Sequence, residues 1–251
     1  MKILLVNDDG YDRGGLPALA EALEACGHEI WIAAPSENCS GKSHSMNLTS
    51  EIHFTRFGRN RYHCSGTPVD CVLYAIKGKL FDSRPDLVIA GINRGPNCST
   101  DITYSGTCGA AREAIYQKIP AISLSQGRPL VKGGPFDYES CARWTAENLD
   151  RLKSLAGLDS FVNVNFPNPF SERVQLGDIG YINYPDRPEK LDKGEVIMMA
   201  MNDGYDFGID MRGRGKGDLE IIHEGCISIS VIRALPALDD EMMARAEKLF
   251  L

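Results

Sequence analysis

Lys2-Ile3-Leu4-Leu5-Val6-Asn7-Asp8-Asp9-Gly10 opens the chain with an aliphatic run that ends in a polar turn. Consecutive apolar residues of this kind predict a strand that is covered on both faces. Apolar residues then recur at helical spacing from Leu16 to Leu23, and a second apolar run occupies residues 29–34. A strand, a helix and a strand in this order predict a parallel pair of strands joined by a crossover helix.

The same alternation of elements repeats downstream. Helical patterns and aliphatic runs take turns along the chain, with helices expected at residues 68–77, 105–117 and 137–156 and strands at 86–90, 121–125 and 161–166. We therefore predict an α/β fold with three α/β/α layers, a Rossmann-like arrangement in which helices cover both faces of a mainly parallel sheet.

The texture of the sequence changes near residue 174. Glycine and proline then separate short segments, and helical periodicity is absent until the last residues. We predict an α/β catalytic core over residues 1–173 and an extended β-hairpin arm for oligomerisation over residues 174–217. Residues 218–251 are expected to return to the core as a strand, at about 226–232, and a terminal helix.

Composition narrows the classes of protein that this chain can be. Its 251 residues are 43% hydrophobic and 24% charged, which is typical of a globular protein. The net charge of -7 argues against a nucleic-acid polymer as partner, because such binding needs a basic surface. The short N-terminal apolar run and the absence of a long apolar segment predict no signal peptide and no membrane span. Eight cysteines without a Cys-x-x-Cys pair predict buried thiols, so we expect a cytoplasmic protein.

Residues rich in oxygen donors follow several of the predicted strands. In an open parallel sheet the ligand crevice lies beyond the carboxyl ends of the strands, so these residues are expected to converge on one edge. They are Asn7, Asp8, Asp9, Ser36, Asn38, Ser40, Gly41, Asn93, Asn97, Ser105, Gly106 and Thr107.

Each of these motifs has a functional and a structural interpretation. Asp8 and Asp9 repel each other at a buried strand end unless a cation offsets their charge, and a hard divalent metal is the simplest answer, although either residue can also cap a helix or make a turn. The asparagines of residues 91–97 supply amide oxygens or form plain turns. Residues 104–107 begin a helix whose free backbone amides can hold an anion, or they form an ordinary Ser or Thr cap.

Taken together, the motifs resemble those of the SurE (survival protein E) family of 5'/3'-nucleotidases. Gly91-Ile92-Asn93-Arg94-Gly95-Pro96-Asn97 is one of them, and the others stand in the same order and spacing at residues 7–10, 34–45, 66–71, 104–107, 163–167 and 225–229. The resemblance covers nearly the whole chain. Departures at Cys98-Ser99 and at residues 112–114 affect the expected substrate preference more than the metal site.

The resemblance implies a metal site and a reaction. It implies that one divalent metal ion per subunit, Mg²⁺ or Mn²⁺, is bound by Asp8, Asp9, Ser40 and Asn93. It also implies hydrolysis of nucleoside 5'- and 3'-monophosphates, and a homodimer or homotetramer in which a C-terminal arm is exchanged between subunits.

Asp8 and Asp9 are the expected catalytic residues, and either a metal-activated water or one of these carboxylates attacks phosphorus. We favour the water, because aspartyl-phosphate enzymes usually separate their two aspartates by one residue and these two are adjacent. The phosphate is expected to contact Asn97, Ser105, Gly106, Thr107, Gly41 and His44. His44 is either the proton donor to the leaving oxygen or a structural hydrogen-bonding residue, and the structural interpretation is favoured. Lys42 and Arg94 either contact substrate or are solvated.

Two other classes of protein compete with this interpretation. The first is a noncatalytic nucleotide-binding or regulatory module on a Rossmann-like sheet, but the turn at residues 7–10 lacks the Gly-x-Gly-x-x-Gly pattern that admits a pyrophosphate. The second is a glycosyltransferase or sugar-nucleotide enzyme with an acidic metal pair, and the absence of a second nucleotide domain argues against it.

Overall fold

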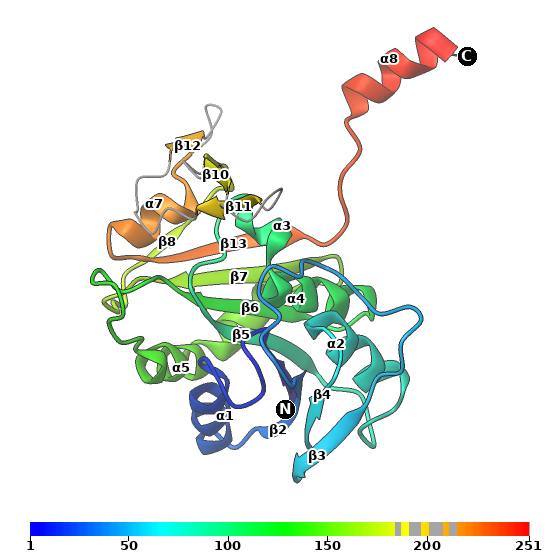
Figure 1. The fold of residues 1–251 in the computed structure, drawn as a ribbon, viewed down its shortest axis with the longest axis vertical. Helices are drawn as coiled ribbons and strands as arrows, with labels where there is room; N and C mark the ends of the chain where they lie inside the picture. Colours follow the sequence, from blue (N-terminus) through cyan, green and yellow to red (C-terminus); the bar gives the residue numbers. More distant parts are fainter. Residues whose placement is uncertain (184–186, 191–196, 201–207, 211–214, 251) are drawn as a thin grey trace.

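A single large sheet organises the chain (Figure 1). The structure is a computed structural model and describes residues 1–183, 187–190, 197–200, 208–210 and 215–250. Within these residues one sheet has the strand order β3-β4-β2-β1-β5-β6-β7-β13-β8. Its strands are β1 (Lys2–Val6), β2 (Glu29–Pro35), β3 (Phe54–Gly58), β4 (Arg61–Cys64), β5 (Leu87–Arg94), β6 (Ala121–Gln126), β7 (Ser160–Phe166), β8 (Val174–Leu176) and β13 (Ile227–Arg233).

The centre of the sheet is parallel. Leu5 of β1 stands opposite Ile32 of β2 on one side and Ile89 of β5 on the other, and both pairings are parallel. The parallel order continues through β4, β6 and β7. Antiparallel pairing appears toward the two edges, between β3 and β4 and between β7 and β13. The predicted mainly parallel α/β sheet is therefore confirmed, whereas the β3–β4 hairpin was not predicted.

Helices cover both faces of the sheet, as the three-layer prediction required (Figure 1). One face carries α1 (Leu16–Ala25), α5 (Tyr138–Glu147) and α6 (Leu149–Leu155), and the other carries α2 (Pro68–Lys77) and α4 (Gly106–Tyr116). Two short helices, α3 (Asp101–Tyr104) and α7 (Asp218–His223), lie near the C-terminal end of β5 and before β13.

The single helix predicted over residues 137–156 is wrong, because the structure has two helices with a break at Asn148. The side-chain amide of Asn148 donates to the carbonyl of Trp144 at 2.9 Å. Asparagine side chains compete with backbone groups for such partners and favour helix ends over helix interiors. The chain therefore ends α5 at Glu147 and begins α6 at Leu149.

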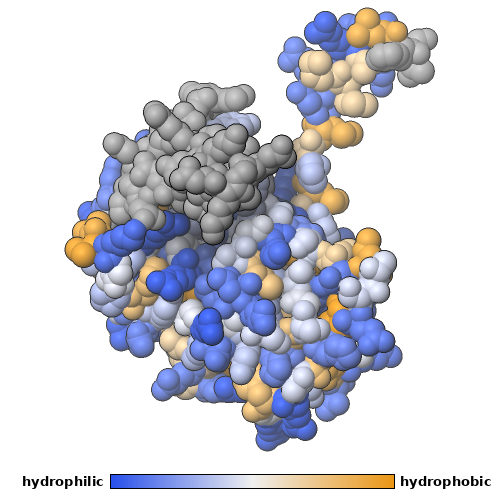
Figure 2. Space-filling model, viewed as in Figure 1, coloured by the Kyte–Doolittle hydropathy of each residue, from blue (hydrophilic) through white to orange (hydrophobic). Residues whose placement is uncertain are grey.

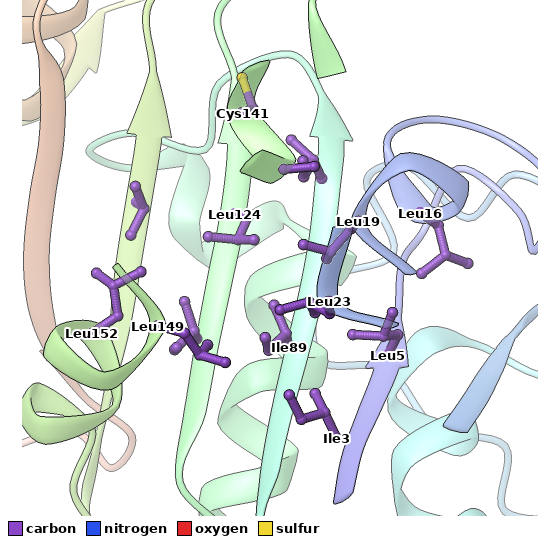
Figure 3. Close-up of a cluster of buried hydrophobic side chains, with 14 of the residues drawn as sticks. Ile3, Leu5, Leu16, Leu19, Leu23, Ile89, Leu124, Cys141, Leu149 and Leu152 are labelled. Atoms are coloured by element: carbon purple, nitrogen blue, oxygen red, sulfur yellow. The ribbon is translucent and has the colours of Figure 1, made fainter. Parts of the chain in front are cut away.

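Side chains of β1 alternate between the two layers of core. Ile3 and Leu5 pack in the apolar cluster under α1, whereas Leu4 and Val6 pack in the cluster under α2 and α4. Figure 3 shows Ile3, Leu5, Ile89 and Leu124 of the sheet against the leucines of α1 and α6. Because both faces of β1 are buried, its sequence is an unbroken aliphatic run.

The predicted arm is seen only in part. Val174–Leu176 forms β8, which pairs with β13 at the edge of the main sheet, so the core extends past the expected boundary at residue 173. Two antiparallel pairs follow, β9 (Tyr181–Asn183) with β12 (Gly208–Asp210) and β10 (Arg187–Lys190) with β11 (Ile197–Ala200). The remaining residues of the predicted arm, 184–186, 191–196, 201–207 and 211–214, lie outside the described residues.

The C-terminal helix was predicted to return to the core, but in the structure it does not. Helix α8 (Asp240–Phe250) projects from the body of the chain on an extended segment (Figure 1). Figure 2 shows apolar residues along this projection, and the exposed ones are Leu235, Leu238, Met242, Met243 and Leu249. In the part of the chain that the structure describes, these exposed apolar side chains therefore do not pack on the core. Among the helices described, none combines the length and apolar character that crossing a bilayer requires.

We expect Ile89→Ala to destabilise the fold by about 2–5 kcal/mol, since Ile89 is fully buried in a central strand and its loss leaves a cavity. Leu176→Ala on the edge strand is the matched control, because Leu176 is 79% exposed. Urea unfolding measures both variants. Equal unfolding free energies for the two variants would contradict this account of the core.

Candidate metal and phosphate site

A cavity of about 960 Å³ opens at the carboxyl ends of the central strands. Its walls come from the end of β5, from the loops after β1, β2, β5, β6 and β7, from the start of α4 and from α7. Six residues that the sequence singled out line it: Asp8, Ser40, Gly41, Asn93, Asn97 and Ser105. The structure therefore brings donors from separate loops to one edge, as the topology predicted.

Asp8 is buried between the end of β1 and the start of α4. The Thr107 hydroxyl donates to Asp8 Oδ1 at 2.8 Å, and backbone N–H groups of Gly106 and Thr107 also donate to the carboxylate. Burial raises the pKa of Asp8, and these hydrogen bonds oppose the rise. A Cβ on Gly106 would lie 3.0 Å from the Asp8 Cβ, so glycine permits this close approach. Gly106 and Thr107 thus act on Asp8 and are not among the described residues that line the cavity.

Asp9, the next residue in the chain, makes different contacts from Asp8. Its Oδ2 accepts a hydrogen bond from the backbone N–H of Arg94 at 3.1 Å. Burial, together with the neighbouring charge of Asp8, raises the pKa of Asp9 to about 6. Of the residues described, those that line the cavity include Asp8 but not Asp9. The adjacent carboxylates therefore have different surroundings, although they are close enough to affect each other's ionisation.

Asn93 reaches the cavity through an irregularity in β5. The register with β6 shifts between Ala90 and Asn93, and Gly91 there has a φ of 129°. A Cβ on Gly91 would lie 2.2 Å from the Leu124 carbonyl oxygen, so only glycine fits. The Asn93 side-chain N–H donates to the Gly95 carbonyl at 2.9 Å, which leaves its amide oxygen as the group that can bind a cation.

Ser40 belongs to a loop that is tied to the end of β1. The N–H of Cys39 donates to the Asp8 carbonyl at 2.7 Å, which holds this loop beside the carboxylate. The Ser40 hydroxyl donates to Asn38 Oδ1 at 2.6 Å. Because its only proton is used there, the hydroxyl oxygen keeps lone pairs that can bind a metal ion.

Polar side chains of β6 and β7 hold Asn97 in place by hydrogen bonds. Its backbone N–H donates to Asn165 Oδ1 at 2.8 Å, and its side-chain N–H donates to the Ser125 hydroxyl at 2.8 Å. Its carbonyl accepts from the side chains of Asn163 and Asn165 at 2.9 and 3.1 Å. Sequence reasoning did not assign a role to these supporting residues. The sequence did contain an indication of this role, since asparagines that interrupt a buried aliphatic strand need hydrogen-bond partners.

His44 lies against α4 and is not among the described residues that line the cavity. Its Nε2 is 2.9 Å from Glu113 Oε2, and its ring contacts that of Tyr116 with centroids 5.3 Å apart. A Cβ on Gly109 would lie 2.6 Å from the Ser43 carbonyl oxygen, so this loop packs tightly on the helix. These contacts favour the structural interpretation of His44.

The donor set fits a hard divalent cation. The described residues contain no group of three or more histidine, cysteine or acidic side chains that could hold a metal. The four expected donors are instead two carboxylates, a hydroxyl and an amide, which are the oxygen ligands that Mg²⁺ and Mn²⁺ prefer. Burial raises the pKa of both Asp8 and Asp9, and the neighbouring charge of Asp8 adds to the rise for Asp9. A bound cation would offset this rise.

Stabilisation by Mg²⁺ or Mn²⁺ should depend on pH. Asp9 has a folded-state pKa of about 6, above its ordinary value of 3.8, so its ionisation opposes folding as pH rises through that range. A cation that needs the ionised carboxylate then stabilises the protein more at pH 7.5 than at pH 5. Thermal unfolding with and without metal measures this difference, and Asp9→Asn should reduce it. Equal metal-induced shifts in Tm at both pH values would contradict the assignment.

Comparison with known proteins identifies relatives along the whole chain. The family model described as "Survival protein SurE" matches residues 3–186. A protein named 5'-nucleotidase SurE from Azorhizobium caulinodans is 31% identical and covers 100% of this chain and 99% of its own length, and one from Hyphomonas neptunium is 35% identical over 92% of both. The crystal structure of the SurE protein from Aquifex aeolicus superimposes with a TM-score of 0.81 at 28% identity over 99% of both chains. The chain belongs to the SurE family, as its motifs predicted.

Proposed function

We propose that this chain is a metal-dependent 5'-nucleotidase that hydrolyses nucleoside 5'-monophosphates, and also 3'-monophosphates, to a nucleoside and phosphate. One observation carries the proposal: Asp8 and Ser40, from the loops after β1 and β2, and Asn93, near the end of β5, line a single cavity. The relatives that bear the name 5'-nucleotidase support it and do not favour a noncatalytic nucleotide-binding module.

We infer that Asp8, Asp9, Ser40 and Asn93 hold one divalent cation per subunit, Mg²⁺ or Mn²⁺. When bound, such an ion neutralises phosphate charge and makes a water molecule more acidic. Ser105 supports phosphate binding because it lines the cavity at the first turn of α4. Its oxygen accepts from the Cys108 N–H at 3.0 Å, so its own O–H proton remains to donate to a phosphate oxygen. Gly41, in the loop that follows β2, also lines the cavity.

The apolar part of the cavity lining suits a nucleoside. The lining includes a set of apolar side chains, Pro167, Phe170, Ile182, Leu219 and Ile222. Ligand sites for small molecules typically combine such surfaces with a few fixed polar groups. A phosphate at the polar groups and a base at the apolar side chains would use both parts of the lining.

The protein's own residues contribute chiefly by fixing geometry. Thr107 and the backbone of α4 hold the Asp8 carboxylate in one orientation, and Asn163 and Asn165 hold Asn97 from the sheet. Preorganised groups of this kind stabilise a transition state without reorganising during the reaction. Water then attacks phosphorus in line with the leaving ribose oxygen, as in other phosphoryl transfers.

We further propose a homodimer or homotetramer in which a C-terminal arm is exchanged, and a cytoplasmic location. Self-association is supported by the apolar side chains that α8 exposes away from the body. The eight cysteines are all free thiols, which is typical of proteins in a reducing compartment.

Asp8→Asn and Asp9→Asn should each remove most phosphatase activity while leaving the fold intact, because each loses a charged metal donor. Release of phosphate from a panel of nucleoside monophosphates, with and without Mg²⁺ or Mn²⁺, measures the effect. Asp82→Asn is the control, since Asp82 is exposed and outside the cavity. Full activity of both variants at saturating metal would refute the assignment.

Thr107→Val should lower turnover by about tenfold or more. The substitution keeps the shape of the side chain but removes the hydroxyl that donates to Asp8, and a lost partner of a buried charge costs about 1–3 kcal/mol. Thr103→Val is the matched control, because Thr103 is exposed and its hydroxyl donates to the carbonyl of Thr100, the residue before α3. Steady-state kcat compares the two, and an equal effect would argue against a specific role of Thr107.

A further inference from the structure

Two arginines emerge from neighbouring strand ends beside the proposed metal site. Arg94 ends β5 and stands opposite Gln126 of β6 in the parallel register. The backbone N–H of Gly95 donates to the Gln126 carbonyl at 3.0 Å, so the two strands stay together to this point. Arg128 follows two residues after the end of β6. Both arginines line the cavity and both are exposed.

The side chains of the two arginines have different neighbours near the end of β5. A Cβ on Gly95 would lie 3.9 Å from Arg128 Nε, which places the side chain of Arg128 over the residue that follows Arg94. The guanidinium of Arg94 lies over the ring of Phe136, 5.5 Å from its centroid. The backbone of Arg94 is fixed by its hydrogen bond to Asp9.

Neither guanidinium is neutralised by an ion pair within the part of the chain that the structure describes. Arg94 interacts with Asp9 at longer range and slightly opposes the rise in its pKa. The chain as a whole carries a net charge of -7, so the arginines that line this cavity are a local exception. A third one, Arg173, also lines it, but its guanidinium donates to the carbonyls of Glu224 and Gly225. Guanidinium groups bind phosphate oxygens in pairs of parallel hydrogen bonds, which makes this part of the wall suited to an anion.

We propose that Arg94 and Arg128 form a second anion site, which binds the second phosphate of a nucleoside 3',5'-bisphosphate while the first phosphate is hydrolysed. The proposal rests on the 5'-nucleotidase function given above. Asn93 and Arg94 are adjacent in the chain, so the proposed metal site and the second anion site are neighbours but use different groups. A nucleoside bisphosphate matches this arrangement because its two phosphates are attached to one ribose and are separated by it.

The reaction is an ordinary hydrolysis. Water forms a bond to phosphorus, the bond from phosphorus to one ribose oxygen breaks, and that oxygen takes up a proton. The products are inorganic phosphate and a nucleoside monophosphate that keeps its other phosphate at the arginines. No oxidant, reductant or second substrate other than water is needed.

Steady-state kinetics of the full-length protein with Mg²⁺ or Mn²⁺ test the proposal. Three substrates with one base are compared, a nucleoside 5'-monophosphate, its 3',5'-bisphosphate and its 5'-diphosphate. We expect a higher kcat/KM for the bisphosphate than for the monophosphate. Arg128→Gln and Arg94→Gln should each lower this ratio by about tenfold, as expected for the loss of one charge-assisted contact, and Arg128→Lys should lower it less.

Arg143→Gln is the matched control, because Arg143 is exposed on α5 and outside the cavity lining, so it should leave the ratio unchanged. Hydrolysis of the monophosphate with a ratio that Arg128→Gln does not change would overturn the second anion site alone. A preference for the diphosphate, lost in Arg128→Gln, would overturn the assignment to a bisphosphate. The absence of phosphate release from every nucleotide would instead reject the proposed function, and the two failures are therefore distinguishable.

Discussion

The buried carboxylate of Asp8 is the constraint on which the site depends. It lies where β1 ends and α4 begins, and its charge is supported by the Thr107 hydroxyl and by backbone N–H groups at the first turn of α4. A helix N-terminus stabilises a nearby anion because its free N–H groups and its dipole both favour negative charge. Burial still raises the pKa of Asp8 despite these contacts. Burial and the charge of Asp8 raise the pKa of Asp9 to about 6, although Asp9 accepts a hydrogen bond from the Arg94 N–H. The turn thus keeps an excess of negative charge that a divalent cation can offset.

The sheet supplies the rigidity that this arrangement needs. Parallel pairing of β5 with β1 and β6 fixes where each loop leaves the sheet, and the bulge at Gly91 turns Asn93 into the cavity. Strand irregularities next to functional sites commonly redirect a side chain in this way. Beneath the loop, Asn163 and Asn165 replace apolar residues in β7 and bind the backbone of Asn97. Burial of such polar groups is favourable only because each finds a partner.

Much of the fold and part of the site could be predicted from the sequence, because the relevant signals are local. Aliphatic runs marked β1, β2, β5, β6 and β7, and the rule for parallel sheets correctly placed Asp8, Ser40 and Asn93 at one cavity. The features that the sequence could not predict depend on contacts between residues that are far apart in the chain. Sequence spacing could not show that Thr107 points to Asp8, or that His44 pairs with Glu113, 69 residues away. Nor could helical periodicity show that α8 leaves its own core, since an apolar stripe fits any apolar partner.

The segment after β8 takes part in the site, although its sequence suggests an appendage. Asp218, at the start of α7, is buried, and its two oxygens accept hydrogen bonds from the Ser99 hydroxyl at 2.6 Å and the Ser99 N–H at 2.8 Å. The Gly180 N–H also donates to the Ser99 hydroxyl oxygen at 3.3 Å. Burial raises the pKa of Asp218, so the carboxylate is retained against a desolvation cost that its partners only partly offset. Ser99 lies two residues after Asn97, so its hydrogen bonds to Asp218 connect the loop that carries Asn97 to α7. Leu219 and Ile222 of α7 also line the cavity. One buried carboxylate therefore connects two parts of the cavity lining that are far apart in the sequence.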